Sequence, residues 1–460
     1  MSSASTTVTH ISECFIKPKY EVKEAKQPYY LSPMDLAMLS AHYIQKGLLF
    51  TKPSNLDNQQ FSIHKFLQNL KDSLSLTLVH FYPLAGQLAS EVDKDQHKCL
   101  IFVDCNKGPG ARFIHATLGM TISNILSPTD VPLVVQSFFD HEKNVNHDGH
   151  FKSLLTIQVT ELLDGIFIAC SMNHSLGDGT SYWNFWNIWS KIHLGLCDEG
   201  VPSSRIPFHK RWFPEGYGPP FLLPFTEPDE FISRFTAPQL RERIFHFSSE
   251  SIARLKAKAN AELNTINEIS SFQALSALCW RAIVRANCLS FERFTNCRLA
   301  ANNRHRLNPP LLHEYFGNCI SALETTTTVG ELLDHNLGWA ASLLHQTVIN
   351  HNDKVLRKFI SGWLKSPIVF QLDKVFDCYS VMMGSSPRFD MYGNEFGLGK
   401  AVALRSGYAN KFVGKVTSYE GYEGGGSVDL EICLPPDSMK ALESDEEFMN
   451  AVCLSHYQIL

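Results

Sequence analysis

The chain has 460 residues, of which 44% are hydrophobic and 11% aromatic, and its formal net charge is −5 at pH 7. This length exceeds a single ordinary core and predicts two domains, and the composition excludes a disordered or fibrous protein. Lysine and arginine number 41 against 46 acidic residues, so no basic excess favours binding to nucleic acid.

The sequence also contains no targeting signal or membrane-spanning segment that we recognise. It has no long apolar run of the kind that predicts a signal peptide or a membrane span. Its twelve cysteines are scattered from Cys14 to Cys453 without a C-x-x-C pair, which indicates reduced thiols. We therefore expect a cytosolic protein with no membrane or nucleic-acid partner.

In the first half, apolar residues at helical spacing predict a helix over residues 61–82. Short β-rich runs predict strands at 154–159 and 165–172. The second of these strands leads directly into residues 173–179, and aromatic residues at helical spacing follow. Residues 173–179 therefore occupy a strand-to-helix loop, a frequent place for catalytic groups.

Between residues 198 and 238 the composition shifts to proline, glycine and aromatics without periodicity, which predicts a crossover between domains. Two helical patterns follow, at residues 251–259 and 271–285. A triple glycine at 424–426 predicts a hairpin turn before an alternating strand at 428–434. A last helix should then begin with Asp437 as its cap.

Alternating helical and strand patterns without repeats predict an α/β fold of mixed sheets flanked by helices. We assign residues 1–200 to a first domain, 201–238 to the crossover and 239–460 to a second domain. A segment near 370–400 is expected to cross back to the first sheet.

His174 is the candidate catalytic base. Removal of a proton from a hydroxyl substrate needs a group that accepts a proton near neutral pH, and histidine has the suitable pKa. His174 follows a predicted strand beside glycines, and Asp178 lies four residues on. Alone, H-x-x-x-D is a weak signal, because about one match is expected by chance in a chain with nineteen histidines. The alternative is a loop histidine near an N-capping aspartate.

Several further segments resemble one family. Residues 173–179, NHSLGDG, resemble the H-x-x-x-D-G signature of the BAHD acyltransferases, and residues 394–400, NEFGLGK, are similar to the second signature, D-F-G-W-G-K. Weaker likenesses occur in family order at residues 31–35, 82–86, 304–307 and 315–319. The resemblance therefore covers nearly the whole chain.

This resemblance implies two similar-sized domains related to chloramphenicol acetyltransferase, with an active-site channel at their interface. Acyl-CoA, as co-substrate, and a small-molecule acceptor would enter from opposite ends. His174 would be the general base for direct attack of a hydroxyl or amine on the thioester, without an acyl-enzyme. Asp178 would pair with Arg304 and hold the loop instead of relaying protons.

The chain departs from the family pattern near the second signature. Ser385 matches a hydroxyl that the family places before this signature, and it is a candidate donor to the oxyanion. Pro387 takes the place of a tryptophan, and Leu398 replaces the tryptophan of the signature itself. Since this element is largely structural in the family, we expect Leu398 to alter packing more than chemistry. We assign the same structural role to Glu395, Gly397 and Gly399.

A CoA site calls for cationic side chains and for donors at helix starts. The matching region holds Arg254, Lys256, Lys258, Ser270 and Ser271. The alternative is an ordinary solvated helix face. No metal is predicted, because His141, His147 and His150 lie in a polar loop that fixes no tetrahedral set. The tryptophans at 183, 186 and 189 are interpreted as helix core.

Two other functions remain open. One is a BAHD-fold lyase that acts on a metabolite conjugate without CoA, favoured by the changes at Pro387 and Leu398. Retention of His174 and Asp178 favours acyl transfer, and dependence on CoA separates the two. The other, less favoured, is a non-catalytic relative. The family implies a monomer and an acceptor from plant secondary metabolism.

Overall fold

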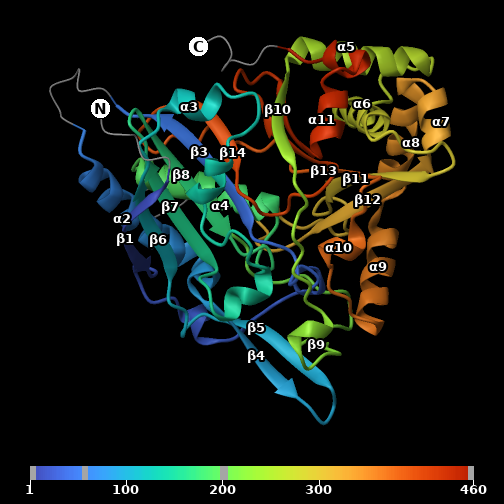
Figure 1. Cartoon of the computed structure of the whole chain (residues 1–460). Helices are drawn as coiled ribbons and strands as arrows, with labels where there is room; N and C mark the ends of the chain where they lie inside the picture. The colour runs from blue at the N-terminus through green and yellow to red at the C-terminus, as the bar shows by residue number, and fades with distance from the viewer. Residues whose placement is uncertain (1–6, 54–60, 197–205, 454–460) are drawn as a thin grey trace.

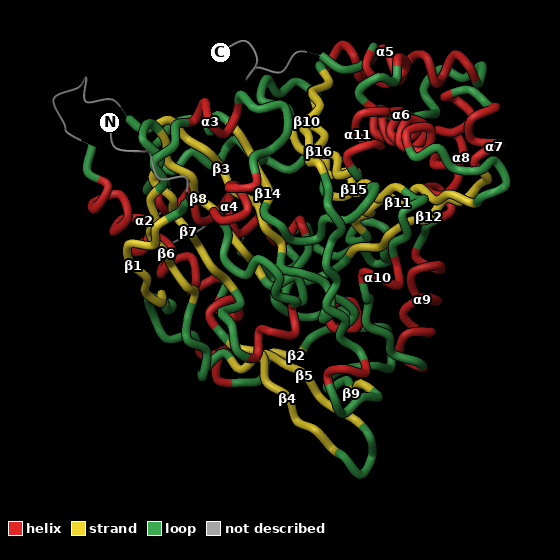
Figure 2. The backbone as a smooth tube through the Cα atoms, in the orientation of Figure 1, coloured by secondary structure: helices red, strands yellow, loops and turns green. Residues whose placement is uncertain are grey.

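The computed structural model describes residues 7–53, 61–196 and 206–453, in which two six-stranded sheets lie side by side, each with helices (Figures 1 and 2). The first sheet has the order β1-β6-β7-β8-β3-β14. Its strands are β1 (Thr9–Ile16), β3 (Ile44–Thr51), β6 (Ala111–Thr117), β7 (Leu155–Glu161), β8 (Gly165–Met172) and β14 (Ala403–Ser406). The helices of this half are α1 (Pro33–Leu36), α2 (Ile63–His80), α3 (Ile122–Leu126) and α4 (Gly179–His193).

The second sheet has the order β10-β16-β15-β13-β11-β12. Its strands are β10 (Arg241–Phe247), β11 (Phe294–Asn302), β12 (Ile320–Thr328), β13 (Val381–Gly384), β15 (Lys415–Glu420) and β16 (Val428–Leu434). Its helices are α5 (Ser249–Glu262), α6 (Ser271–Ala286), α7 (Val329–Asp334), α8 (Leu337–Asn350), α9 (Asp353–Lys365), α10 (Leu372–Val375), α11 (Pro436–Leu442) and α12 (Glu446–Met449). A small third sheet contains β2 (Tyr29–Tyr30), β4 (Gln87–Asp93), β5 (Lys98–Asp104) and β9 (Leu222–Leu223).

The first sheet is covered on both faces. Leu48 and Phe50 of β3 pack into the core that contains α2 and α4, whereas Leu49 packs into a second cluster with Phe138 and Phe167. Successive side chains of a strand point to opposite faces, so both faces need apolar residues. This explains why the central strand β8 is buried at every position.

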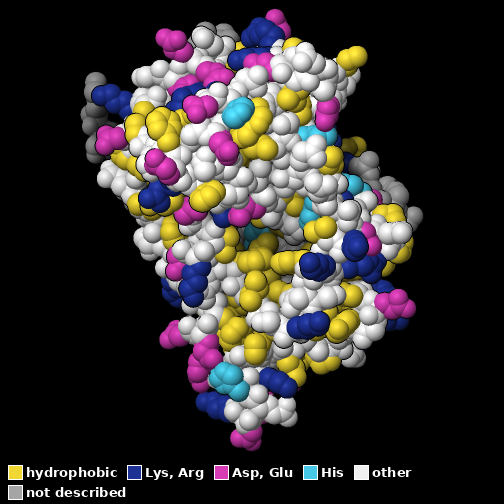
Figure 3. Space-filling model, turned by 90° about the vertical axis from the view of Figure 1, so that its right-hand side faces the viewer, with side chains coloured by type: hydrophobic (Ala, Val, Ile, Leu, Met, Phe, Trp, Pro, Cys, Tyr) yellow, Lys and Arg dark blue, Asp and Glu magenta, His cyan; other side chains and the backbone are white. Residues whose placement is uncertain are grey.

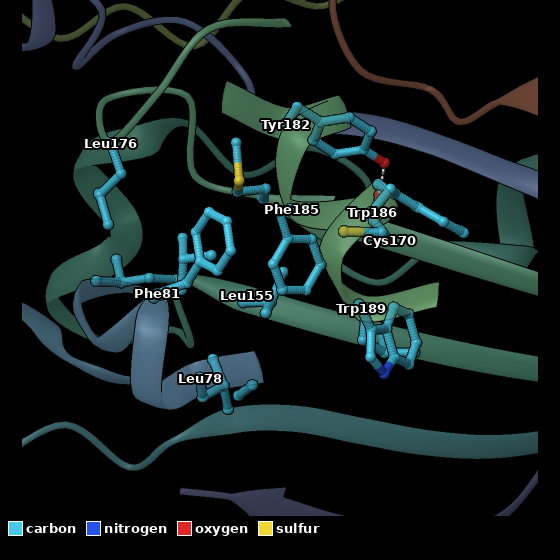
Figure 4. Close-up of a cluster of buried hydrophobic side chains, with 14 of the residues drawn as sticks. Leu78, Phe81, Leu155, Cys170, Leu176, Tyr182, Phe185, Trp186 and Trp189 are labelled. Carbon is cyan, nitrogen blue, oxygen red and sulfur yellow. Dashed lines mark hydrogen bonds between the residues drawn. The ribbon is translucent and has the colours of Figure 1, made fainter. Parts of the chain in front are cut away.

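Helix α4 supplies the largest side chains of the first core (Figure 4). Trp186 and Trp189 are fully buried, and the Tyr182 hydroxyl donates a hydrogen bond to the Cys170 carbonyl at 3.0 Å. Trp189 donates its ring N–H to the Ser73 hydroxyl at 3.1 Å, which satisfies its polar atom. The interpretation as helix core is confirmed for Trp186 and Trp189, whereas Trp183 packs in the same core and also lines a cavity between the two sheets. Helix α4 is thereby fixed immediately after the 173–179 loop.

The second sheet is apolar on one face and polar on the other. In β16, Leu430 and Ile432 pack against the helical layer, and Glu431 between them points to the opposite face. In β15, Val416 faces the helices while Lys415 faces the first domain. The alternation of strand side chains therefore gives the second domain a polar inner face.

The chain returns to the first sheet after β13. This strand lies in the second sheet between β11 and β15, and β14 then pairs antiparallel with β3, with Ala403 opposite Leu49. The crossing expected near residues 370–400 thus ends on a strand just beyond that range. The connection between β13 and β14 contains both Ser385 and the second signature.

Most predicted elements are present with small shifts of their ends. The helix predicted over 61–82 is α2, and the strand predicted at 428–434 coincides with β16, which follows the predicted glycine turn after β15. The expected cap Asp437 is wrong: Pro435 is the cap and Pro436 opens α11. Proline suits the first helical position because its fixed φ matches the helix and its missing N–H is not needed there.

The crossover segment is more than a linker where it is described, from residue 206. Arg211 is buried, and it forms an ion pair with Asp35 at 3.2 Å and donates to the carbonyls of Phe316 and Leu176. Residues 201–205 lie outside the described part.

No helix in the described ranges is long and apolar enough to cross a membrane. Each cysteine in those ranges is a free thiol.

Candidate active site

A cavity of about 1100 Å³ lies between the two sheets and is lined from both halves of the chain. His174, Thr180 and Trp183 line it from the first half, and Met382 and Ser385 line it from the second. On the face that carries α9 and α10, hydrophobic side chains gather around a hollow (Figure 3). A pocket of this size at a domain interface is the expected place for small-molecule chemistry.

The loop that carries His174 is held by asparagine side chains. The backbone N–H of His174 donates to Asn146 Oδ1 at 2.7 Å, and Asn318 Nδ2 donates to the His174 carbonyl at 2.7 Å. Asp35 in turn accepts hydrogen bonds from the backbone N–H and the side chain of Asn318, at 2.8 and 2.9 Å. Two of the weaker likenesses, residues 31–35 and 315–319, therefore fix the backbone of the candidate base.

Asp178 points away from the cavity. Its carboxylate accepts hydrogen bonds from Arg304 at 2.7 and 3.0 Å, from the backbone N–H groups of Thr180 and Ser181, and from that of Cys319. Arg304 and Asp178 are both buried. The pairing that the resemblance implied is present, and Asp178 also caps α4, so it serves as a helix cap and as an ionic anchor.

The environment shifts the pKa values of both motif residues downward. Burial lowers the pKa of His174 below its ordinary value, the positive charge of Lys415 acts in the same direction, and Asp178 opposes them. Burial would raise the pKa of Asp178, but Arg304 and the backbone donors outweigh it and hold this pKa below its usual range. His174 is therefore neutral and Asp178 ionised at pH 7.

Ser385 follows the last residue of β13 and has a φ of 65°. A non-glycine residue in this left-handed region is uncommon and is often part of a functional site. The conformation places Ser385 on the cavity wall. Pro387, at the place of the family tryptophan, is not among the residues that line the cavity.

The second signature lies outside the cavity. Phe396 is buried against Trp186 and Trp189 of α4, with ring centroids 5.7 and 4.7 Å away, whereas Glu395 is exposed. Leu398 is partly buried at the edge of the same core. This arrangement agrees with a packing role for the element.

The backbone conformation of the glycines in the second signature can be tested by its effect on stability. Gly397 has a φ of 73°, and a methyl group there would meet only a Leu194 carbon at 3.9 Å among the described atoms. Gly397→Ala should lower the free energy of unfolding by about 1–2 kcal/mol, because only the backbone conformation is strained. Gly362→Ala, in an open position of helix α9, should instead raise it by about 0.5–1 kcal/mol. Urea unfolding measures both, and equal effects would contradict the strain argument.

The residues predicted for CoA lie on α5 and at the start of α6. Lys256 and Ser271 line a second cavity of about 400 Å³, together with Gly425 and Gly426 of the glycine turn. Arg254 is exposed and pairs with Glu250, and Lys258 pairs with Glu447 at 3.5 Å. Ser270 caps α6 by accepting from the N–H of Gln273. The structure thus brings two of the five residues to a common hollow.

Sequence reasoning missed a group of charged residues on the cavity wall. Lys46, Lys411 and Lys415 lie there with Glu431. The available signal was the position of Lys46 in β3 and of Glu431 in β16, two mostly apolar strands, because charged side chains are almost never fully buried without a partner. The histidines at 141, 147 and 150 play no comparable part, and the described residues contain no group of three or more His, Cys, Asp or Glu that could hold a metal ion.

Comparison with known proteins agrees with this architecture. The family model described as Transferase family matches residues 6–449. An uncharacterized acetyltransferase of Arabidopsis thaliana is 36% identical over 449 residues, which cover 96% of this chain and 98% of that relative. BAHD acyltransferase DCR of A. thaliana is 32% identical over 453 residues, which cover 95% of this chain and 92% of that relative.

Solved structures match at the level of the fold. The crystal structure of vinorine synthase superposes with a TM-score of 0.74 at 20% identity, covering 98% of this chain and 100% of that one. F. sporotrichioides TRI101, complexed with coenzyme A and T-2, superposes with a TM-score of 0.72 at 19% identity, covering 93% and 99%. These matches confirm the predicted two-domain fold, and with the family model and the relatives they show that the chain belongs to the BAHD family of acyltransferases.

Proposed function

We propose that this protein transfers an acyl group from a CoA thioester to a hydroxyl or amine of a small plant metabolite. The observation that carries the proposal is His174, a neutral imidazole on the wall of a large cavity between two domains. Membership in an acyltransferase family supports acyl transfer as the reaction. The TRI101 structure in complex with coenzyme A supports CoA as the co-substrate.

In this mechanism His174 removes the acceptor proton while the acceptor oxygen or nitrogen attacks the thioester carbonyl. The Nδ1 atom of the ring is buried, so Nε2 is the atom left for the acceptor. The attack forms a tetrahedral intermediate, and the Ser385 hydroxyl donates a hydrogen bond to its oxyanion. Collapse of the intermediate breaks the carbon–sulfur bond, and His174 returns the proton to the CoA sulfur.

Direct transfer requires both substrates to be bound at once. The cavity, at about 1100 Å³, is slightly larger than the range typical of small-molecule sites, which is about 300–1,000 Å³. Lys256 and Ser271, which line the second cavity, are offered as contacts of CoA. Asp178 and Arg304 fix the loop in this scheme and do not touch the reacting atoms.

The test is turnover of an acceptor panel by the purified protein with acetyl-, malonyl-, benzoyl- and hydroxycinnamoyl-CoA. Cys288 and Cys378 are exposed and would react with a thiol reagent, so free CoA should be measured by chromatography and the product by mass spectrometry. We expect CoA release that depends on the acceptor, and no added acyl mass on the protein when the acceptor is omitted. Conversion of a metabolite without CoA would support the lyase alternative instead.

The pH dependence tests His174 as the base. Because burial lowers its pKa, the imidazole stays in its active neutral form below its ordinary value of 6.5. With a neutral acceptor, kcat/KM should stay level from about pH 7.5 to about 6.5, and it should fall about tenfold per pH unit only below the lowered pKa of His174. A decline that starts near pH 7.5 would contradict a lowered pKa.

A further inference from the structure

A set of buried and half-buried charges lies on the inner face of the second sheet, where it meets β3. Lys411 pairs with Glu242 and lies 3.9 Å from Glu431. Lys46 donates to the Tyr419 hydroxyl at 2.8 Å, and this hydroxyl donates to Glu431 at 3.1 Å. Glu242 and Glu431, the carboxylates that these two lysines reach, are themselves buried.

Lys415 is the third lysine of this set, and it differs from the other two. Its ammonium forms no ion pair or hydrogen bond with any described residue, and the ring of Phe412 lies 5.8 Å from it. Lys411 contacts Glu242 and Glu431, and Lys46 reaches Glu431 through the Tyr419 hydroxyl, so the set holds three lysines and two glutamates, an excess of one positive charge when all five are ionised. Burial lowers the pKa of Lys415 to about 8, Lys46 acts in the same direction, and Glu431 opposes them.

The ammonium of Lys415 lies close to the reacting groups. A Cβ atom on Gly384 would come within 2.2 Å of Lys415 Nζ, so the ammonium passes directly over this glycine. Ser385, the next residue, lines the cavity together with His174. The charge of Lys415 also reaches His174, whose pKa it lowers. The unpaired cation therefore lies beside the residue that precedes the candidate oxyanion donor and acts electrostatically on the candidate base.

We propose that Lys415, supported by Lys46, binds a carboxylate of the substrate, so that this enzyme acts on a carboxylate-bearing acyl group or acceptor. A single carboxylate matches the one excess positive charge of the set, whereas a phosphate would exceed it. In a site shielded from water, a charge-assisted hydrogen bond to a carboxylate is strong and selective. The proposal rests on the proposed function for the identity of the reacting groups, but the binding itself needs no turnover.

The first experiment measures binding by isothermal titration without catalysis. The acceptor arm uses 4-hydroxycinnamate and 4-hydroxybenzoate against their methyl esters, and the donor arm uses malonyl-CoA against acetyl-CoA. We expect the wild type to prefer the acid in at least one arm by about tenfold or more. The arm that shows the preference identifies the partner that carries the carboxylate. Equal affinity for acid and neutral ligand in both arms would overturn the proposal.

The second experiment assigns the preference to Lys415. Lys415→Met and Lys46→Met remove the charge at nearly constant length, and Lys365→Met, on the exposed end of α9, is the matched control. Lys415→Met should abolish the acid preference and leave binding of the neutral ligand within about twofold, and Lys46→Met should reduce the preference less. Thermal unfolding confirms that each variant is folded, and Lys415→Gln replaces the Met variant if it is not.

Turnover separates this proposal from the proposed function. An equal loss of kcat for carboxylate and neutral substrates in Lys415→Met would place the lysine on the oxyanion and overturn the carboxylate assignment. Acid-selective binding that Lys415→Met abolishes, in a protein with no CoA-dependent turnover, would uphold the carboxylate site and reject acyl transfer.

Discussion

His174→Ala should lower kcat by about 10²- to 10⁴-fold, the usual contribution of a positioned general base. The loop should keep its structure, because its anchors are the backbone N–H and carbonyl of residue 174, which the substitution retains. Acceptor-dependent CoA release, measured alongside the melting temperature, checks both expectations.

His64→Ala is the control for this variant, since His64 is exposed on α2 and lies outside the cavity. Its activity should equal that of the wild type. Substantial CoA release by folded His174→Ala protein would show that another group accepts the proton. A loss of activity accompanied by a large drop in melting temperature would indicate that the imidazole stabilises the loop, contrary to the geometry.

Arg304→Met should lower the free energy of unfolding by about 3–5 kcal/mol, because it leaves the carboxylate of Asp178 buried without its counter-charge. Activity should fall as well, since the 173–179 loop and the start of α4 depend on the position of Asp178. Urea unfolding gives the stability and CoA release gives the activity. A loss below about 1 kcal/mol would mean that Asp178 is not held by this pair.

Two further variants sharpen the test. Arg254→Met removes an exposed cation paired with Glu250 and should cost less than about 1 kcal/mol. Asp178→Asn combined with Arg304→Met should recover part of the stability, because the lone buried charge is gone.

The pH dependence of stability follows from the lowered pKa of Asp178. A carboxylate with a lowered folded-state pKa contributes stability above its unfolded pKa and loses it as the pH falls through the folded value. In Arg304→Met the buried Asp178 loses the charge that lowers its pKa, so the stability difference between wild type and variant should begin to narrow above about pH 4 and continue to narrow as the pH falls further.

Local patterns in the sequence were sufficient for most elements of the fold. The strand predicted at 165–172 is β8, and the helical pattern at 271–285 is α6. These predictions succeed because hydrophobic periodicity follows which face of an element is buried. Periodicity fails for short elements. The chain crosses back to the first sheet just after the second signature and forms β14 there, but this strand has only four residues and is too short to show a period.

The sequence determined by itself which residues could perform the chemistry, because the motif around His174 and its place after a strand are local features. Only the tertiary structure decided what surrounds that histidine. Asp178 meets Arg304 across 126 positions of the chain, and Lys46 meets Tyr419 across 373. Such pairs depend on how two sheets face each other, and no local pattern records that geometry. The unpaired charge of Lys415 could be recognised only once its neighbours were in place.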